Sequence, residues 1–367
     1  MKAPSTHPAR TLVRRFLDAH PAPTGRELAD AGLVCPHWPR PWGIDADPLT
    51  QLAIDEELAA AGVDRPDNQI GTGWAGPTVI AAGTDEQKSR YLPPLLAGEE
   101  IWCQLFSEPD AGSDLASLRT AAVRDGDDYV ITGQKIWTTW ADRADYGILL
   151  ARTDPSVPKH RGISYFLFPM RQDGVTVRPI REMSGGHHFN EVFLDRARVP
   201  AANRVGEEGD GWRLAGITLG NERVSLSTGG LCWGLGPTHD DFVALVRERG
   251  PIVDPVLRQR IADAWIHGEI IRLIGERITA ALAAGGRPGP EASVKKVLAD
   301  EHGQRVTALV KDLCGPGGML ADAGPLGADV GEWHWAYLFA RALTIGGGTG
   351  EVQRDILAQS ILGLPRS

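Results

Sequence analysis

The sequence predicts an α+β protein in three parts: an N-terminal α-helical part over residues 1–101, a middle antiparallel β-sheet or β-barrel over 102–206, and a C-terminal helix bundle over 207–367. Two observations support this order. Apolar residues recur at helical spacing before residue 100 and after residue 211, and short β-branched or aromatic runs lie between these stretches. A chain of 367 residues also suits several structural units better than one small core.

Two stretches carry the clearest helix signals of the N-terminal part. Asp47–Val63 places Leu and Ile on one face, with Ala and Glu between them. A second helix begins at Thr84, whose hydroxyl can cap the first turn while Gln87 returns the bond, and the two acidic residues between them suit the positive end of the helix dipole. This helix is predicted to end near Leu96–Glu100.

The middle part changes to short runs that are rich in β-branched and aromatic residues and are separated by Gly, Pro and Asp. Their spacing fits an antiparallel sheet or barrel of roughly a hundred residues. The predicted strands are Tyr129–Trp137, Tyr146–Thr153, Gly162–Met170, Val175–Ile180 and Asn190–Pro200.

Long helices return in the C-terminal part, over 211–229, Val256–Gly285 and Glu291–Gly315. An apolar stripe typical of a helix bundle marks the second of them, at Ile271, Ile274, Ile278 and Leu282. A last helix is predicted after Gly346–Gly348. Three residues without side chains at a helix start suit either a ligand that approaches the backbone N–H groups closely or a tight turn.

Composition and generic motifs exclude several classes of function. A net charge of −9 without a Lys/Arg stripe argues against nucleic-acid binding. No apolar run is long enough for a signal peptide or a membrane span, so we expect a cytoplasmic protein. The four cysteines form no CxxC pair, the glycines lack the lysine of a phosphate-binding loop, and His187 and His188 lie in a loop-like stretch that does not favour a metal site.

Four motifs in order give the chain a family resemblance. CQLFSEPDAGSDLASLRT (103–120) resembles the central signature of the acyl-CoA dehydrogenase family, and GQKIWTT (133–139) resembles its second flavin-contacting strand. GTDEQKSRYLPPLLAGE (83–99) is similar to the N-terminal signature, and 209–227 to the helix that begins the C-terminal bundle. The resemblance implies the family fold, one non-covalent FAD per subunit, and a homo- or heterotetramer in which neighbours complete the FAD site.

The resemblance also implies a set of residues that contact the flavin. Phe106 and Ser107 match donors that face the ring, and Gly112 and Ser113 match the turn near the phosphates and the acyl chain. For Trp137 the alternative is a tryptophan of the sheet core. The complete set implied by resemblance is Phe106, Ser107, Gly112, Ser113, Trp137, Thr139, Thr349 and Glu351.

The catalytic base departs from the commonest family pattern. Many members carry a glutamate before the last helix, where this chain has Gly347, whereas others carry it on the first long helix of the bundle, directly before an arginine, as Glu222 stands before Arg223. Leu219, Glu222 and Leu226 also share one helical stripe, so we expect Glu222 to be partly desolvated and its pKa raised.

The backbone of Gly346–Gly348 is predicted to take part in the site although these residues have no side chains. By resemblance, the N–H of Gly347 would face the thioester carbonyl, and the missing side chain leaves room for Glu222 or for a bulkier acyl group. Ser113, Asn221 and Arg223 are the predicted substrate contacts. Two stretches match the family more weakly: Val246–Arg260 and Asp312–Gly318.

Three functions remain open from the sequence. The first is FAD-dependent oxidation of an acyl-CoA or acyl-carrier-protein thioester to the trans-2-enoyl thioester, with Glu222 as base and an electron-transfer flavoprotein as acceptor. The second is a non-catalytic partner subunit of a heteromeric dehydrogenase, because Gly347 replaces the usual glutamate. The third is a flavin monooxygenase or nitroalkane oxidase on the same fold. The sequence does not identify the acyl group.

Overall fold

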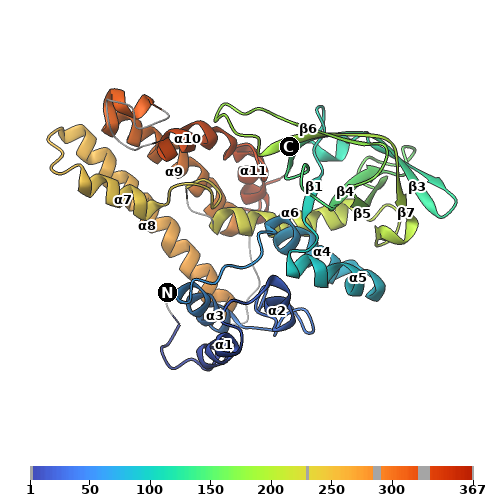
Figure 1. Ribbon diagram of the computed structural model, residues 1–367. Coiled ribbons are helices and arrows are strands. Elements are labelled where there is room, and N and C mark those ends of the chain that lie inside the picture. Colours follow the sequence, from blue (N-terminus) through green and yellow to red (C-terminus); the bar gives the residue numbers. More distant parts are fainter. Residues whose placement is uncertain (1–2, 229–230, 284–290, 321–330, 366–367) are drawn as a thin grey trace. The chain divides into compact units, whose positions relative to one another are not determined.

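The computed structural model describes residues 3–228, 231–283, 291–320 and 331–365, without the side chains of 223–228, 279, 282–283 and 291–292 (Figure 1). It contains two compact units. Unit 1 comprises Met1–Glu182 and Gly186–Asn221, and unit 2 comprises Met183–Gly185 and Glu222–Ser367. Both the helical and the sheet parts predicted for the first two hundred residues lie in unit 1, where they share one apolar core.

Unit 1 begins with helices whose ends follow their capping residues. Thr84 and Gln87 form the predicted capping box, and Gly98 ends that helix in the left-handed conformation with φ 71°. The predicted helix at Asp47–Val63 is also confirmed, because Asp47 caps it. The helices are α1 (Pro8–Ala19), α2 (Gly25–Asp30), α3 (Pro48–Ala60), α4 (Gly76–Ala82), which follows a π-helical turn at Gly71–Ala75, and α5 (Asp85–Ala97).

The sheet of unit 1 contains all five predicted strands and three further short ones. Along its main path the order is β6-β7-β3-β2-β4-β5-β8, and β1 pairs with β4. The strands are β1 (Trp102–Leu105), β2 (Ala121–Asp125), β3 (Asp128–Thr139), β4 (Tyr146–Arg152), β5 (Ile163–Pro169), β6 (Val175–Pro179), β7 (Phe189–Pro200) and β8 (Arg204–Val205).

One detail of the predicted sheet needs correction. Most neighbouring strands are antiparallel, but β1 runs parallel to β4, and β2 meets β4 in a single parallel pair. Both faces of the central strands are buried, because Ile148 and Leu150 of β4 join one apolar cluster while Leu149 and Ala151 join another. The strands therefore read as continuous apolar runs instead of alternating ones.

Unit 2 is built from helices around α9. The end of α6 (Gly211–Thr228) lies in it, and α9 contacts α8, α10 and α11. The buried side of α9 carries Lys296, Val306 and Val310. The other helices of the unit are α7 (His239–Glu248), α8 (Pro255–Ala283), α9 (Glu291–Cys314), α10 (Gly331–Phe339) and α11 (Gly350–Ser360), with 3-10 turns at Gly315–Met319 and Ala340–Ala342.

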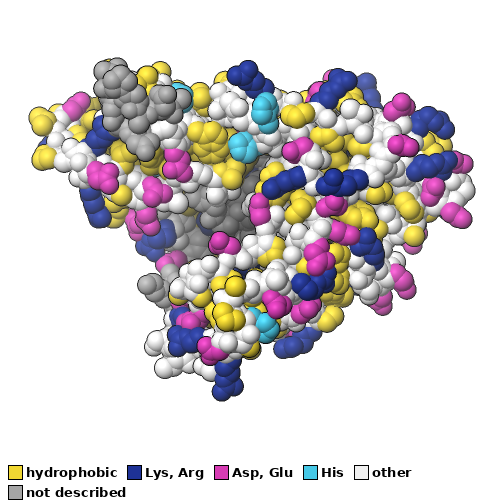
Figure 2. Space-filling view, viewed as in Figure 1, with side chains coloured by type: hydrophobic (Ala, Val, Ile, Leu, Met, Phe, Trp, Pro, Cys, Tyr) yellow, Lys and Arg dark blue, Asp and Glu magenta, His cyan; other side chains and the backbone are white. Residues whose placement is uncertain are grey.

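The surface shows no large region of one charge on the face in Figure 2, where basic and acidic side chains are interspersed. Among the helices that the structure describes, none has both the length and the apolar character needed to cross a membrane.

Candidate active site

The loop after β1 brings two of the recognised motifs together. Phe106 packs its ring into the core, 6.1 Å from the ring of Tyr165, so only its backbone can face a ligand. The carbonyl of Ser107 accepts a hydrogen bond of 3.0 Å from the N–H of Ile136 in β3. Beyond the turn, Gly112 and Ser113 are exposed. This loop and the end of β3 therefore form one surface of unit 1.

A buried ion pair lies beneath this loop. Lys135 is fully buried, and its Nζ donates to Glu108 Oε1 and to the carbonyl of Phe106, each at 2.9 Å. The Glu108 carboxylate also accepts from the N–H groups of Arg119 at 2.6 Å and Thr120 at 2.8 Å. Burial favours a raised pKa for Glu108, but the Lys135 ammonium and these donors outweigh it and lower the pKa, whereas burial lowers the pKa of Lys135 to about 8.

Trp137 is not a tryptophan of the sheet core, so that alternative is wrong. Its side chain is 58% exposed, and its backbone has φ 61°, a left-handed conformation that non-glycine residues rarely adopt. The β3–β7 pairing shifts register between Lys135 and Thr138, which turns the indole out of the sheet and sets it edge-on to Phe189 at 6.0 Å. Thr139 is partly exposed at the end of the same strand.

Gly112 gives a second sign of a ligand on this surface. A Cβ placed on it would meet nothing within 4 Å, and its φ does not require glycine. Neither packing nor backbone conformation in the described structure therefore explains the residue. A group that lies close to the backbone would explain it.

In unit 2, the three glycines before α11 each have a structural reason. A Cβ on Gly346 would lie 2.4 Å from the ring of Trp233, while Gly347 and Gly348 have φ 65° and 88°. The carbonyl of Gly347 accepts from Gln353 Nε2 at 2.9 Å, and that of Gly348 from Lys296 Nζ at 3.3 Å. The segment Gly346–Gly348, called the glycine turn below, thus has fixed carbonyl groups.

The N–H of Gly347 is different, because it donates no hydrogen bond to an acceptor within the described chain. The residue is only partly exposed. A donor that is held by its surroundings and left free can bind a carbonyl oxygen of a ligand.

Thr349 and Glu351 are brought together at one cavity of unit 2, of about 350 Å³. Thr349 caps α11 by accepting from the N–H of Val352 at 3.2 Å. Hydrogen bonds from its own N–H and from Thr349 lower the pKa of Glu351. The complete lining is Val297, Asp300, Glu301, Thr344, Ile345, Thr349, Gly350, Glu351 and Arg354.

Glu222 is buried, with 5% of its surface exposed, as the helical stripe predicts. One turn earlier on α6, Thr218 is anchored by hydrogen bonds to Thr78 at 2.8 Å and Tyr165 at 3.0 Å. Asn221 turns its amide back to the carbonyl of Ile217 at 3.0 Å. The side chain of Arg223 lies outside the described residues.

The two stretches that match the family weakly lie side by side in unit 2. Arg260 forms an ion pair with Asp312 at 2.7 Å, and Arg249 donates to the sulfur of Cys314 at 3.1 Å. Sequence alone does not place these stretches together.

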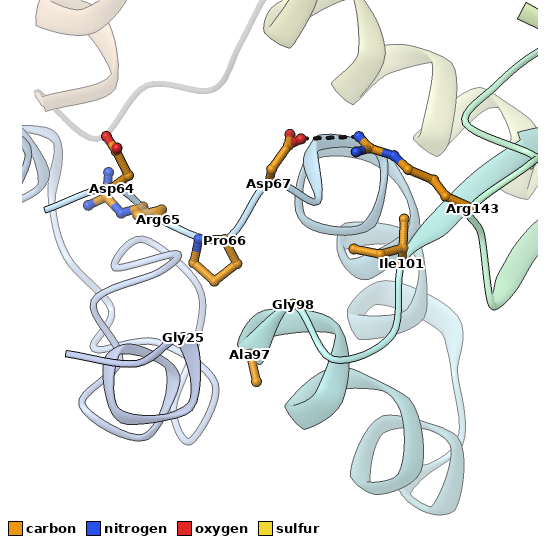
Figure 3. Close-up of a pocket in the computed structure, with 9 residues that line it drawn as sticks. All are labelled: Gly25, Asp64, Arg65, Pro66, Asp67, Ala97, Gly98, Ile101 and Arg143. Atoms are coloured by element: carbon orange, nitrogen blue, oxygen red, sulfur yellow. Dashed lines mark hydrogen bonds and ion pairs between the residues drawn. The ribbon is translucent and has the colours of Figure 1, made fainter. Parts of the chain in front are cut away.

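A second cavity, of about 450 Å³, is lined by residues of unit 1, none of which is a predicted site residue (Figure 3). An ion pair of 3.1 Å between Arg143 and Asp67 borders it, and Gly25 and Gly98 pack closely against Pro66. The full lining is Gly25, Asp64, Arg65, Pro66, Asp67, Ala97, Gly98, Ile101 and Arg143.

Comparisons with known proteins agree along the chain. Models of the acyl-CoA dehydrogenase N-terminal, middle and C-terminal domains match residues 9–99, 103–197 and 209–362. "Acyl-CoA dehydrogenase FadE34" of Mycobacterium tuberculosis is 44% identical over 92% of this chain, and the match spans 46% of that protein. "Acyl-CoA dehydrogenase IpdE1" of the same species is 41% identical over 93% of this chain and 87% of the relative.

This chain belongs to the acyl-CoA dehydrogenase family. The predicted family, fold class and class of enzyme, an oxidoreductase, are thus confirmed. Two solved structures agree with this family fold. The "Tcur3481-Tcur3483 steroid ACAD" has a TM-score of 0.81 and 32% identity over 98% of this chain and 94% of that one. The "ChsE4-ChsE5 complex from Mycobacterium tuberculosis" has a TM-score of 0.79 and 33% identity over 99% of both chains.

For an acyl-CoA dehydrogenase, which is a flavoprotein, unit 1 offers a suitable flavin surface. An exposed indole in a strained conformation suits a planar ring, and the open space at Gly112 suits close approach to the backbone. The sequence analysis missed the buried pairs Lys135–Glu108 and Lys296–Asp300. The signals were present, as a lysine within a flavin motif and as oppositely charged residues four apart on a helix.

Proposed function

We propose that this chain catalyses the FAD-dependent α,β-dehydrogenation of an acyl-CoA thioester to its trans-2-enoyl product, with Glu222 as the base. The observation that carries the proposal is the burial of Glu222, because a desolvated carboxylate is a stronger base for a weakly acidic α-proton. The free N–H of Gly347 adds a donor for the thioester oxygen, where negative charge develops as that proton leaves.

The residues of unit 1 would hold the isoalloxazine. Trp137 and Thr139 would flank the ring, the backbone of Phe106 and the hydroxyl of Ser107 would donate to it, and Gly112 with Ser113 would approach the phosphates. Thr349 and Glu351 of unit 2 would make further FAD contacts. FAD, when bound, accepts the β-hydride at N5.

The acyl group is proposed to be bulky and to contain rings. Gly347 has no side chain, which leaves space next to the thioester. In support, one relative is named "Cyclohexane-1-carbonyl-CoA dehydrogenase" of Geobacter metallireducens, 32% identical over 77% of this chain, and one similar structure is described as a steroid ACAD. Ser113, Asn221 and Arg223 are the proposed substrate contacts.

A heteromeric assembly is also proposed, from the names of the similar structures and the length of one relative. Both similar structures described above carry two protein names. This chain spans about half of FadE34, which leaves room in that relative for a further part. An electron-transfer flavoprotein is the proposed electron acceptor.

The test uses the full chain, purified alone and with a co-expressed partner dehydrogenase chain, and begins with the flavin absorbance per polypeptide. Anaerobic bleaching of the flavin is then followed with cyclohexane-1-carbonyl-CoA and with the CoA thioester of a steroid side-chain acid. Glu222→Gln is expected to retain flavin and to slow bleaching by at least about 100-fold, because the general base is lost.

Glu248→Gln, an exposed glutamate near the end of α7, is the matched control and is expected to bleach at the wild-type rate. Full-rate bleaching by Glu222→Gln would exclude Glu222 as base. A chain that binds flavin but oxidises no thioester in either assembly would favour the non-catalytic partner function.

A further inference from the structure

The glycine turn rests on a buried lysine that no step above uses. Lys296 on α9 is fully buried, and its Nζ contacts Asp300 Oδ2 at 2.5 Å, the carbonyl of Leu343 at 3.4 Å and the carbonyl of Gly348 at 3.3 Å. An ammonium group has three N–H donors, so each contact can receive one. A buried lysine is otherwise costly, and these contacts compensate its desolvation.

The two carbonyls bracket the turn on both sides. Leu343 precedes the glycines and Gly348 ends them, so one ammonium group ties the entry and the exit of the turn to α9. Asp300 lies one helical turn after Lys296 on the same helix, which presets the position of the ammonium group before the turn docks on it.

Glycine makes such a tether necessary. Consecutive glycines have the widest choice of backbone conformations, so the direction of the Gly347 N–H is not set by the local sequence. The Trp233 ring blocks one side at Gly346. Burial raises the pKa of Asp300, and Lys296 and Trp233 oppose this shift. Trp233, Asp300 and Lys296 thus form a platform under the turn.

We propose that Lys296 is a positioning residue: its ammonium, set by Asp300, holds the carbonyls of Leu343 and Gly348 and thereby aims the N–H of Gly347 at the substrate oxygen. The inference rests on the proposed dehydrogenation for its catalytic part. The tether itself is a property of unit 2 alone. The tether gives a function to the buried Lys296–Asp300 pair, whose desolvation costs folding free energy.

The experiment compares four full-length proteins: wild type, Asp300→Asn, the double variant Lys296→Met/Asp300→Asn, and Lys295→Met. The double variant removes both charges, so no unpaired buried charge remains. Asp300→Asn keeps the lysine and its two carbonyl contacts. Lys295 is a second buried lysine of α9 whose Nζ faces Gly275 of α8, which makes Lys295→Met the matched control.

The first readout is hydrogen–deuterium exchange of the amides of Ile345, Gly346 and Gly350, which donate to the carbonyls of Ala342 and Thr344 at and around the glycine turn. We expect exchange at least about 10-fold faster in the double variant, since local opening sets exchange. Asp300→Asn should show intermediate exchange, because it keeps the lysine but removes the carboxylate that positions it, and Lys295→Met should exchange at the wild-type rate. Unchanged exchange in the double variant would overturn the tether.

The second readout is turnover of cyclohexane-1-carbonyl-CoA. The double variant is expected to lose kcat by about 10- to 100-fold with KM within about threefold, because the misdirected donor acts only on developing charge. Faster exchange with unchanged kcat would overturn the catalytic part. If the wild type oxidises no thioester, the proposed reaction fails, while the exchange result still decides whether Lys296 holds the turn.

Discussion

Lys135 of unit 1 and Lys296 of unit 2 are both fully buried, both pair with a carboxylate and both donate to a carbonyl of a loop in the candidate site. Their carboxylate partners differ. Glu108 accepts from two backbone N–H groups as well as from Lys135, and its pKa is lowered. Asp300 has a neighbouring Glu301 and lines a cavity, and burial raises its pKa to about 6.

The difference shows that the other donors around a buried carboxylate, and not the ion pair alone, decide its charge. Hydrogen bonds from backbone N–H groups stabilise the ionised form of a carboxylate such as Glu108. Unit 1 therefore holds a buried pair whose carboxylate is kept ionised, beneath the loop that follows β1. In unit 2, burial raises the pKa of the acid of the pair, Asp300, to about 6.

The largest expected effect tests the buried Lys135–Glu108 pair of unit 1. Lys135→Met leaves Glu108 buried without its cation, so the free energy of unfolding should fall by about 3–5 kcal/mol. Urea unfolding measures it. Lys159→Met is the control, because its ion pair with Asp114 is exposed and should contribute less than about 1 kcal/mol. A loss below about 1 kcal/mol for Lys135→Met would mean that the N–H donors alone satisfy Glu108.

The second prediction concerns Asp300 and pH. Its folded-state pKa of about 6 lies above the usual 3.8, so the folded protein holds this proton more tightly than the unfolded chain. The stability from this group is full below about pH 4 and is lost as the pH rises through about 6, by roughly 3 kcal/mol in all. Urea unfolding of wild type and Asp300→Asn between these pH values should differ by this slope, and parallel profiles would contradict the raised pKa.

The third prediction compares glycines of the two units. Gly346→Ala places a Cβ against the Trp233 ring, so we expect a loss of about 1–3 kcal/mol in unfolding free energy from overpacking. Gly112→Ala meets open space and should leave stability within about 0.5 kcal/mol while it weakens flavin binding. Thermal unfolding and flavin titration measure the two effects. Equal destabilisation by both changes would show that Gly112 is also a packing residue.

The fold was largely predictable from sequence because local signals and tertiary structure agree. Periodicity located the long helices, and the Thr84–Gln87 capping box set one helix start. β2 was missed because Ala121–Asp125 is short and largely exposed, and β8 because it has only two residues. The parallel direction of β1 depends on where the chain crosses the sheet, which no local pattern encodes.

Site residues were predicted only where a motif names them, and their contacts with a flavin stay predictions. For Trp137 the structure adds strain and exposure, which come from a register shift between β3 and β7 that the sequence does not show. Lys135 and Lys296 were missed because lysine is seldom buried, and charges four apart on a helix more often face solvent. Their burial is decided by the loops that dock on them.

The smallest expected effect compares two helix caps with the same chemistry. Thr84 caps α5 in a capping box and Thr349 caps α11 with a single bond, so Thr84→Ala and Thr349→Ala should each lower the unfolding free energy by about 0.5–2 kcal/mol, the former more. Only Thr349 borders the cavity next to the glycine turn. Flavin affinity, measured by titration of the apoprotein, should therefore fall for Thr349→Ala and stay unchanged for Thr84→Ala. Equal affinities in the two variants would remove Thr349 from the proposed FAD contacts and leave it as a cap alone.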